Sequence, residues 1–134
     1  MKYIPPVVSA LLGLLFLSAS VMVLFNLVQP KPEDMPPEGS PAALFMGALG
    51  PTGMLTLIKL CELVGGLLVI VPRTRNIGLL VLGPIIVNIL AYHALIAKDL
   101  TSSGGTIGML AFLSLAPLYL LWVERRAWAG LLRR

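Results

Sequence analysis

The sequence predicts an all-α integral membrane protein, a single domain over residues 1–134 folded as a four-helix bundle with a short interfacial segment after the first loop. Two observations carry this prediction. First, 57% of the 134 residues are hydrophobic and only 12% are charged, which lies far outside the composition of soluble globular proteins. Second, the apolar residues form long continuous runs without the alternation of β-strands, and a bilayer core of about 30 Å needs about 20 apolar residues of helix.

Four apolar runs give the expected membrane spans. They cover residues 5–28, 51–71, 77–97 and 106–123. The first run follows Lys2 and continues through Phe25, which is longer than the core of a secretion signal, so we expect it to be retained as a span. A turn at residues 71–76, which contains Pro72, makes the second and third spans an antiparallel hairpin.

The connector between the first two spans is rich in proline and acidic residues. Residues 29–41 therefore cannot sustain a helix or a central strand, and we expect them to form an extracytoplasmic loop. Residues 42–49 are apolar again, before Gly50 and Pro51 interrupt the chain. This segment is too short to cross a bilayer, so we expect a short interfacial or re-entrant helix.

The basic residues predict the orientation of the spans. With four spans, seven of them fall on one side and two, Lys31 and Lys98, fall on the other. The seven are Lys2, Arg73, Arg75, Arg125, Arg126, Arg133 and Arg134. This asymmetry predicts a multi-pass protein of the cytoplasmic (inner) membrane with both termini in the cytoplasm. The formal net charge of +4 is thus explained by membrane orientation, and no nucleic-acid partner is expected.

The second span contains two ionisable residues, Lys59 and Glu62. Their three-residue spacing places both on one helical face together with Gly66, where the two side chains can touch. Charges inside a membrane usually face the interior of a bundle or a cavity. Gly65 and Gly66 allow another helix backbone to approach closely, so we expect both glycines to serve helix packing.

The other polar residues of the spans lie at a similar depth. Lys59 and Glu62 fall in the outer half of the second span, and Asn88, Tyr92 and His93 fall in the outer half of the third. These five residues are therefore the candidate ligand-binding residues of a polar pocket that opens outward. A structural ion pair that closes the bundle is the alternative for Lys59 and Glu62. His93 lies about 140° around an ideal helix from Asn88, so a structural hydrogen bond to a neighbouring helix is its alternative.

The spacing of these residues resembles a known family. Lys59 and Glu62 before the glycine pair, followed by Pro84, Asn88 and His93, resemble the DoxX family of small four-helix membrane proteins. This resemblance implies a fold that spans the whole chain. It also implies a link to membrane redox complexes, because family members are related to membrane subunits of thiosulfate:quinone oxidoreductase, or to membrane-protein assembly, in which distant relatives assist. Many members have no assigned activity.

Several kinds of chemistry lack the residues that they need. Cys61 is the only cysteine, so the chain has no intrachain disulfide and no Cys-x-x-Cys motif, and Cys61 is most simply a packing residue. The sequence holds no metal-ligand spacing, no phosphate loop and no nucleophile motif, so no metal and no covalently bound cofactor are expected. The sequence leaves open whether the chain is an enzyme or an accessory subunit of an oxidoreductase, and the catalytic residues are unknown.

Two hypotheses on function follow. In the first, the outward-facing pocket binds a quinone or another lipophilic small molecule in support of a membrane redox system, because such a ligand needs donors at its carbonyl oxygens. In the second, the chain is a non-enzymatic assembly factor or interaction subunit whose polar stripe, formed by Lys59 and Glu62 on one face of the second span, docks a partner helix. The expected partners are accordingly the lipid bilayer, a lipophilic small molecule, and either another membrane protein or a second copy of the chain.

Overall fold

The computed structural model of the chain describes residues 1–132, and over this range it is all-helical, with no strand. Its long helices are α1 (Ile4–Leu24), α3 (Met54–Ile70), α4 (Arg75–Ala91) and α5 (Gly104–Val123). The shorter elements are the 3-10 turn η1 (Pro32–Asp34), α2 (Pro41–Leu49), the π-helical turn η2 (Tyr92–Ala97) and α6 (Arg125–Leu132). The predicted all-α class is confirmed.

Several helices can cross a membrane. Three segments are long and apolar enough by themselves, namely α1, α4 continued by η2, and α5. Helix α3 has 17 residues, which make about 26 Å of helix. It passes the same test only when it is taken together with α2, from which it is bent by 77°. The described chain therefore has three to four helices that fit a multi-pass membrane protein.

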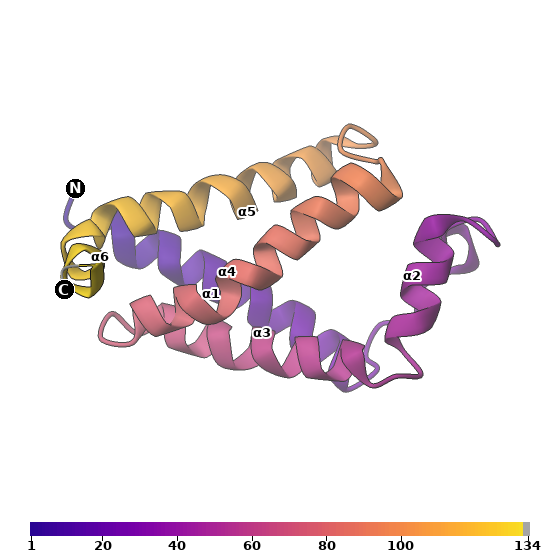
Figure 1. Cartoon of the computed structure of the whole chain (residues 1–134), viewed down its shortest axis with the longest axis horizontal. Helices are drawn as coiled ribbons and strands as arrows, with labels where there is room; N and C mark the ends of the chain where they lie inside the picture. Colours follow the sequence, from indigo (N-terminus) through magenta and orange to yellow (C-terminus); the bar gives the residue numbers. More distant parts are fainter. Residues whose placement is uncertain (133–134) are drawn as a thin grey trace.

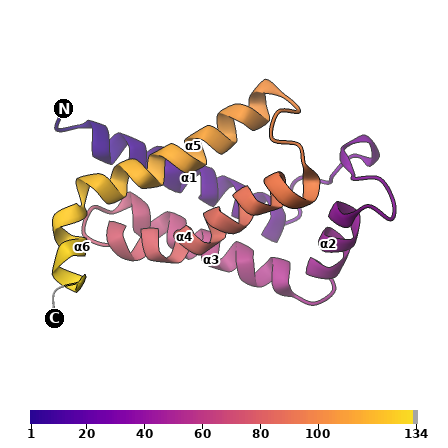
Figure 2. The ribbon, with the colours of Figure 1, turned by 45° about the horizontal axis from the view of Figure 1, so that its top comes forward.

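The long helices alternate in direction along the chain (Figure 1). The N-terminus, the turn between α3 and α4, and α6 lie at one end of the molecule, which we call the terminal end (Figures 1 and 2). Helix α2 and the loop between α4 and α5 lie at the other end, which we call the α2 end. Helix α3 packs against both α1 and α4, and α5 packs against α1 and α4.

Glycines allow α1, α3 and α4 to pack closely. A Cβ atom on Gly66 of α3 would lie 3.0 Å from the carbonyl oxygen of Gly13 in α1. A Cβ atom on Gly78 of α4 would lie 2.5 Å from the backbone nitrogen of Val69 and 2.9 Å from the carbonyl oxygen of Gly65, both in α3. Without side chains at these points the backbones can meet, which is how membrane helices gain packing contacts.

The buried core is shared by the four long helices. It consists of Leu12, Phe16, Val69, Leu79, Leu82, Ile86, Leu113, Ala116 and Leu120. The outward faces of the same helices are also apolar, with exposed side chains that include Leu14, Leu57, Leu80 and Leu115. A surface of this kind fits contact with lipid, because a soluble protein rarely exposes large continuous apolar patches.

The first helix is shorter than the expected span 5–28, because it ends at Leu24. Asn26 adopts a positive φ of 50°, a conformation that asparagine tolerates better than most residues. The amide of Leu27 donates to the carbonyl oxygen of Met22 at 2.9 Å, and the amide of Asn26 donates to that of Val23 at 3.2 Å. These bonds form a Schellman C-cap. The cap ends the helix although apolar residues continue beyond it.

The other three spans start two or three residues away from the expected bounds, and they end within one residue of them. Helix α3 begins at Met54, because Gly53 precedes it with a φ of 75°. Helix α5 begins at Gly104, because the Oγ of Ser103 accepts a hydrogen bond from the amide of Thr106 at 3.1 Å. The connector contains one short 3-10 turn, η1, where no helix was expected. The short helix expected over residues 42–49 is present as α2, whereas α6 was not expected.

Candidate functional site

The ion pair of the second span is formed in the structure. The Nζ atom of Lys59 lies 2.8 Å from Oε2 of Glu62, three residues later on α3. The Glu62 side chain is 3% exposed and that of Lys59 is 16% exposed. Helix α1 covers this face, with the Oγ of Ser20 at 3.4 Å from Oε2 of Glu62. The pair therefore lies between α1 and α3.

Lys59 is the main partner of the buried carboxylate. The hydroxyl of Ser20 has a single proton, and its contact of 2.6 Å with the carbonyl oxygen of Phe16 is much shorter than its contact with Glu62. The proton therefore goes to Phe16. This leaves the ammonium of Lys59 as the donor that compensates Glu62.

Lys59, unlike Glu62, also borders an open groove. The groove has a volume of about 590 Å³ and is walled by α1, the connector, α2 and α3. Its lining residues are Ala19, Met22, Val23, Asn26, Val28, Pro30, Met46, Leu55 and Lys59. Asn26 and Lys59 are the polar side chains in this lining. The groove thus combines an apolar wall with one cation held in place by a buried carboxylate.

The two aromatic candidates of the third span take part in a different cluster, at the α2 end. His93, which is part of η2, has its Nδ1 atom 2.7 Å from Oδ1 of Asp99, which follows η2. The ring of Tyr92 contacts His93 edge-on at a centroid distance of 5.2 Å. The ring of Tyr92 also contacts that of Phe45 in α2, at a centroid distance of 5.4 Å. Tyr92 therefore joins α2 to η2, and His93 holds the start of the loop between α4 and α5.

The structure does not gather the five candidate residues into one pocket. Tyr92 and Asp99 line a cavity of about 310 Å³ that shares no lining residue with the Lys59 groove. Asn88 is exposed on α4 and makes no side-chain hydrogen bond among residues 1–132. Lys59 and Glu62 are thus brought together, Tyr92 and His93 are brought together elsewhere, and Asn88 belongs to neither group.

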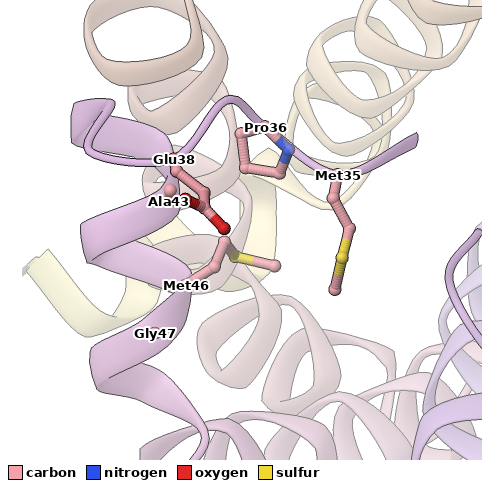
Figure 3. A pocket seen from close by; sticks show the side chains of 6 residues that line it. All are labelled: Met35, Pro36, Glu38, Ala43, Met46 and Gly47. Atoms are coloured by element: carbon pink, nitrogen blue, oxygen red, sulfur yellow. The ribbon is translucent and has the colours of Figure 1, made fainter. Parts of the chain in front are cut away.

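A third hollow lies between these two sites. It has a volume of about 340 Å³ and is lined by Met35, Pro36, Glu38, Ala43, Met46 and Gly47 (Figure 3). Met46 also lines the Lys59 groove, and Met35 and Pro36 also line the Tyr92 cavity. Helix α2 is consequently bordered by hollows along its length. It is attached to the rest of the molecule through Phe45 and through the bend before Met54.

The sequence-based reasoning missed a second ion pair, at the terminal end. Arg75 Nη1 lies 3.0 Å from Oε1 of Glu124, and the two side chains are 6% and 26% exposed. Arg75 begins α4 and Glu124 follows α5, so the pair joins two helices that are far apart in the sequence. One signal could have found it, because Glu124 is the single acidic residue on the side where seven basic residues gather.

The acidic, histidine and cysteine side chains of the described residues are spread over separate sites. No group of three or more His, Cys, Asp or Glu side chains is placed to hold a metal ion within residues 1–132. Cys61 is a free, half-buried thiol on α3. The Lys59 groove is suited to an apolar molecule that carries a hydrogen-bond acceptor or a negative charge, because its lining is apolar except for Asn26 and Lys59.

The chain was compared with known protein families, curated proteins and solved structures. No family model, no curated protein and no solved structure matches the chain.

Proposed function

We propose that the protein is a four-helix bundle of the cytoplasmic membrane that binds a quinone-like lipophilic molecule in the Lys59 groove and so supports a membrane redox system. The observation that carries this proposal is the position of Lys59. Its ammonium is fixed by the buried Glu62 at 2.8 Å and also borders a groove that is otherwise almost entirely apolar. The resemblance of residues 59–93 to the DoxX family supports the same proposal.

The groove suits a ligand with an apolar body and a carbonyl head. Its volume of about 590 Å³ falls within the usual size of small-molecule sites. An ammonium group has three N–H donors, and Glu62 accepts one of them. The remaining donors of Lys59 and the side-chain amide of Asn26 would bind the carbonyl oxygens. Met22, Val23 and Leu55 would contact the apolar body.

The roles of the candidate residues follow from their positions. Lys59 binds the ligand, and Glu62, which does not line the groove, positions Lys59. Tyr92 holds α2 through Phe45 and so supports Met46, which forms one wall of the groove. His93 and Asp99 keep the loop after η2 in place. In this proposal Asn88 has no part in ligand binding.

Docking of a partner helix by the polar stripe receives less support. Glu62 is 2% exposed, because α1 already covers the face that carries it. A partner helix would have to displace α1 from the close contact between Gly13 and Gly66. Helix α1 of the same chain thus already occupies the position that a partner helix would take on the polar stripe. We therefore favour ligand binding over an assembly role.

The proposed orientation places the α2 end outside the cytoplasm. Lys31 and Lys98 are the basic residues near that end, and the acidic Glu33, Asp34, Glu38 and Asp99 accompany them. Fusion of alkaline phosphatase after Glu38 is expected to give an active enzyme, because this reporter folds only outside the cytoplasm, whereas a fusion after Arg75 is expected to be inactive. The reverse pattern would invert the orientation and place the Lys59 groove toward the cytoplasm.

A bulky substitution in the Lys59 groove is expected to displace the ligand while Lys59 and Glu62 stay unchanged. Ala19 of α1 lines the groove and is half-buried. Ala19→Phe would occupy space that the ligand needs, and overpacking of this kind is expected to lower ligand occupancy about tenfold. Occupancy is measured by native mass spectrometry of protein purified in mild detergent.

The matched control for this variant is Ala111→Phe. Ala111 is exposed on α5 and lines none of the cavities described above. The Ala111→Phe variant adds the same ring to a surface that faces lipid, so its ligand occupancy is expected to equal that of the wild type. Equal ligand retention by Ala19→Phe and by the control would exclude the groove as the site.

A further inference from the structure

Helix α6 is fixed across the terminal end of the molecule by one of its faces (Figures 1 and 2). The chain turns at Glu124, whose carbonyl oxygen accepts hydrogen bonds from the amides of Ala127 at 2.9 Å and Trp128 at 3.3 Å. The Glu124 side chain forms the ion pair with Arg75, and Trp128 packs against the hydrophobic core. Both side chains point to the bundle, so the opposite face of α6 is free to contact its surroundings.

That opposite face carries Arg126, which lies about 200° around the helix from Trp128 and is exposed. Arg125 lies about 60° from Trp128 and is also exposed. Its guanidinium lies 4.7 Å from the centre of the Trp122 ring and donates to the carbonyl oxygen of Trp122 at 3.0 Å. The Trp122 side chain is itself 67% exposed, although it is large and apolar.

The terminal end as a whole carries positive charge that the described residues do not balance. Lys2, Arg73, Arg125 and Arg126 are exposed there, and we call these four residues the basic rim. Glu124, the acidic residue at this end, is already paired with Arg75. Arg126 lies in the first turn of α6, where positive charge opposes the dipole of that helix, and it makes no hydrogen bond or ion pair among residues 1–132. Contacts within the described chain thus do not explain its placement, whereas Arg125 donates to the carbonyl oxygen of Trp122 at the C-terminus of α5.

Hydrogen-bond donors are in surplus at the same end. The guanidinium groups of Arg73 and Arg126 are exposed and make no hydrogen bond or ion pair among residues 1–132. Their N–H donors can bind oxygen acceptors that carry negative charge. Phosphate oxygens satisfy guanidinium groups especially well, because two parallel N–H donors can bind two oxygens at once.

We propose that the basic rim and the outward face of α6 bind the headgroups of anionic phospholipids on the side of the membrane where the termini lie. An exposed tryptophan beside an arginine is typical of the membrane–water interface, which accounts for Trp122. Clusters of basic residues next to a span are attracted to the negative surface of a leaflet. This interaction is separate from the Lys59 groove and does not depend on what the groove binds.

Lipid selectivity tests the proposal directly. Full-length protein in mild detergent is offered equal amounts of phosphatidylglycerol and phosphatidylcholine with the same acyl chains, and native mass spectrometry measures the ratio of the two lipids that it retains. The wild type is expected to prefer phosphatidylglycerol. The double variant Arg125→Gln with Arg126→Gln is expected to lower this preference about 5- to 30-fold, because two surface charges are lost.

The control removes the same charge from the other end of the molecule. Lys31→Gln with Lys98→Gln is expected to keep the wild-type preference. Arg126→Gln alone, which removes a side chain without a described contact, is expected to lose part of it even if the double variant folds poorly. An unchanged preference in both arginine variants, or an equal loss in the lysine control, would overturn the proposal.

A final comparison separates a lipid surface from a free anion. Protein stripped of lipid is offered inorganic phosphate and phosphatidylglycerol in equal amounts, and native mass spectrometry measures which of the two it retains. Binding of a lipid headgroup predicts retention of phosphatidylglycerol over phosphate, because the acyl chains of the lipid also contact the apolar surface of the helices. Retention of inorganic phosphate at equal or higher occupancy would assign the site to a soluble phosphate instead and overturn the assignment to lipid.

Discussion

Lys59→Met alone is expected to lower the free energy of unfolding by about 3–5 kcal/mol, because breaking a buried ion pair leaves an uncompensated charge. The charge left behind is the carboxylate of Glu62, whose side chain is 3% exposed and whose main donor is Lys59. Ser20 cannot replace that donor, since its proton is directed to Phe16. Thermal unfolding in mild detergent, followed by circular dichroism, measures the loss.

Glu62→Gln alone is expected to cost less, and it serves as the matched control. The ammonium of Lys59 borders the open groove and can extend toward the interface, as long basic side chains do near membrane surfaces. The double variant Lys59→Met with Glu62→Gln removes both charges and is expected to unfold at nearly the wild-type temperature. A Lys59→Met protein as stable as the wild type would show that Glu62 needs no partner.

Gly78→Ala is expected to destabilise the protein by about 1–3 kcal/mol through overpacking of α3 against α4. The added methyl group would meet backbone atoms of α3, with the nitrogen of Val69 at 2.5 Å and its Cα at 2.8 Å. Backbone atoms cannot move aside as the end of a flexible side chain can. The two helices must therefore separate, which also loosens the core around Leu79 and Leu82.

Helix α5 provides the control for this variant. Gly108 is part of α5, and a Cβ atom added there would meet no atom within 4 Å apart from its chain neighbours and its own helix backbone. Gly108→Ala is therefore expected to leave the melting temperature unchanged or to raise it, because alanine favours a helix by up to about 1 kcal/mol over glycine. Equal melting temperatures of the two variants would contradict the close contact between α3 and α4.

The features that the sequence predicts correctly depend on local chemistry. The apolar runs locate the long helices, because a run of about 20 apolar residues suffices to define one. The contact between Lys59 and Glu62 follows from their spacing of three residues on one helix. In the same way, the short apolar segment before Gly50 and Pro51 predicts α2. None of these features requires knowledge of how the helices are arranged.

The features that the sequence does not predict depend on backbone irregularities and on tertiary contacts. His93 meets Asp99 because η2 is a π-helical turn and because Lys98, which follows it, has a φ of 54°. An ideal helix gives no sign of that contact. Arg75 meets Glu124 only once α4 and α5 are placed side by side. The single outward pocket was predicted from the depth of its residues alone, and depth does not fix which neighbouring element each side chain contacts. The structure places Lys59 with Glu62 and Tyr92 with His93 at separate sites.

Ligand retention by the double variant distinguishes a binding site at Lys59 from a structural ion pair. The wild type and the folded variant Lys59→Met with Glu62→Gln are purified in mild detergent and compared by native mass spectrometry. The wild type is expected to retain a lipophilic small molecule, and the double variant, although it melts at nearly the same temperature, is expected to lose it. A wild type that never carries such a molecule, or a double variant that keeps it at equal occupancy, would contradict ligand binding in the Lys59 groove and identify the ion pair as structural.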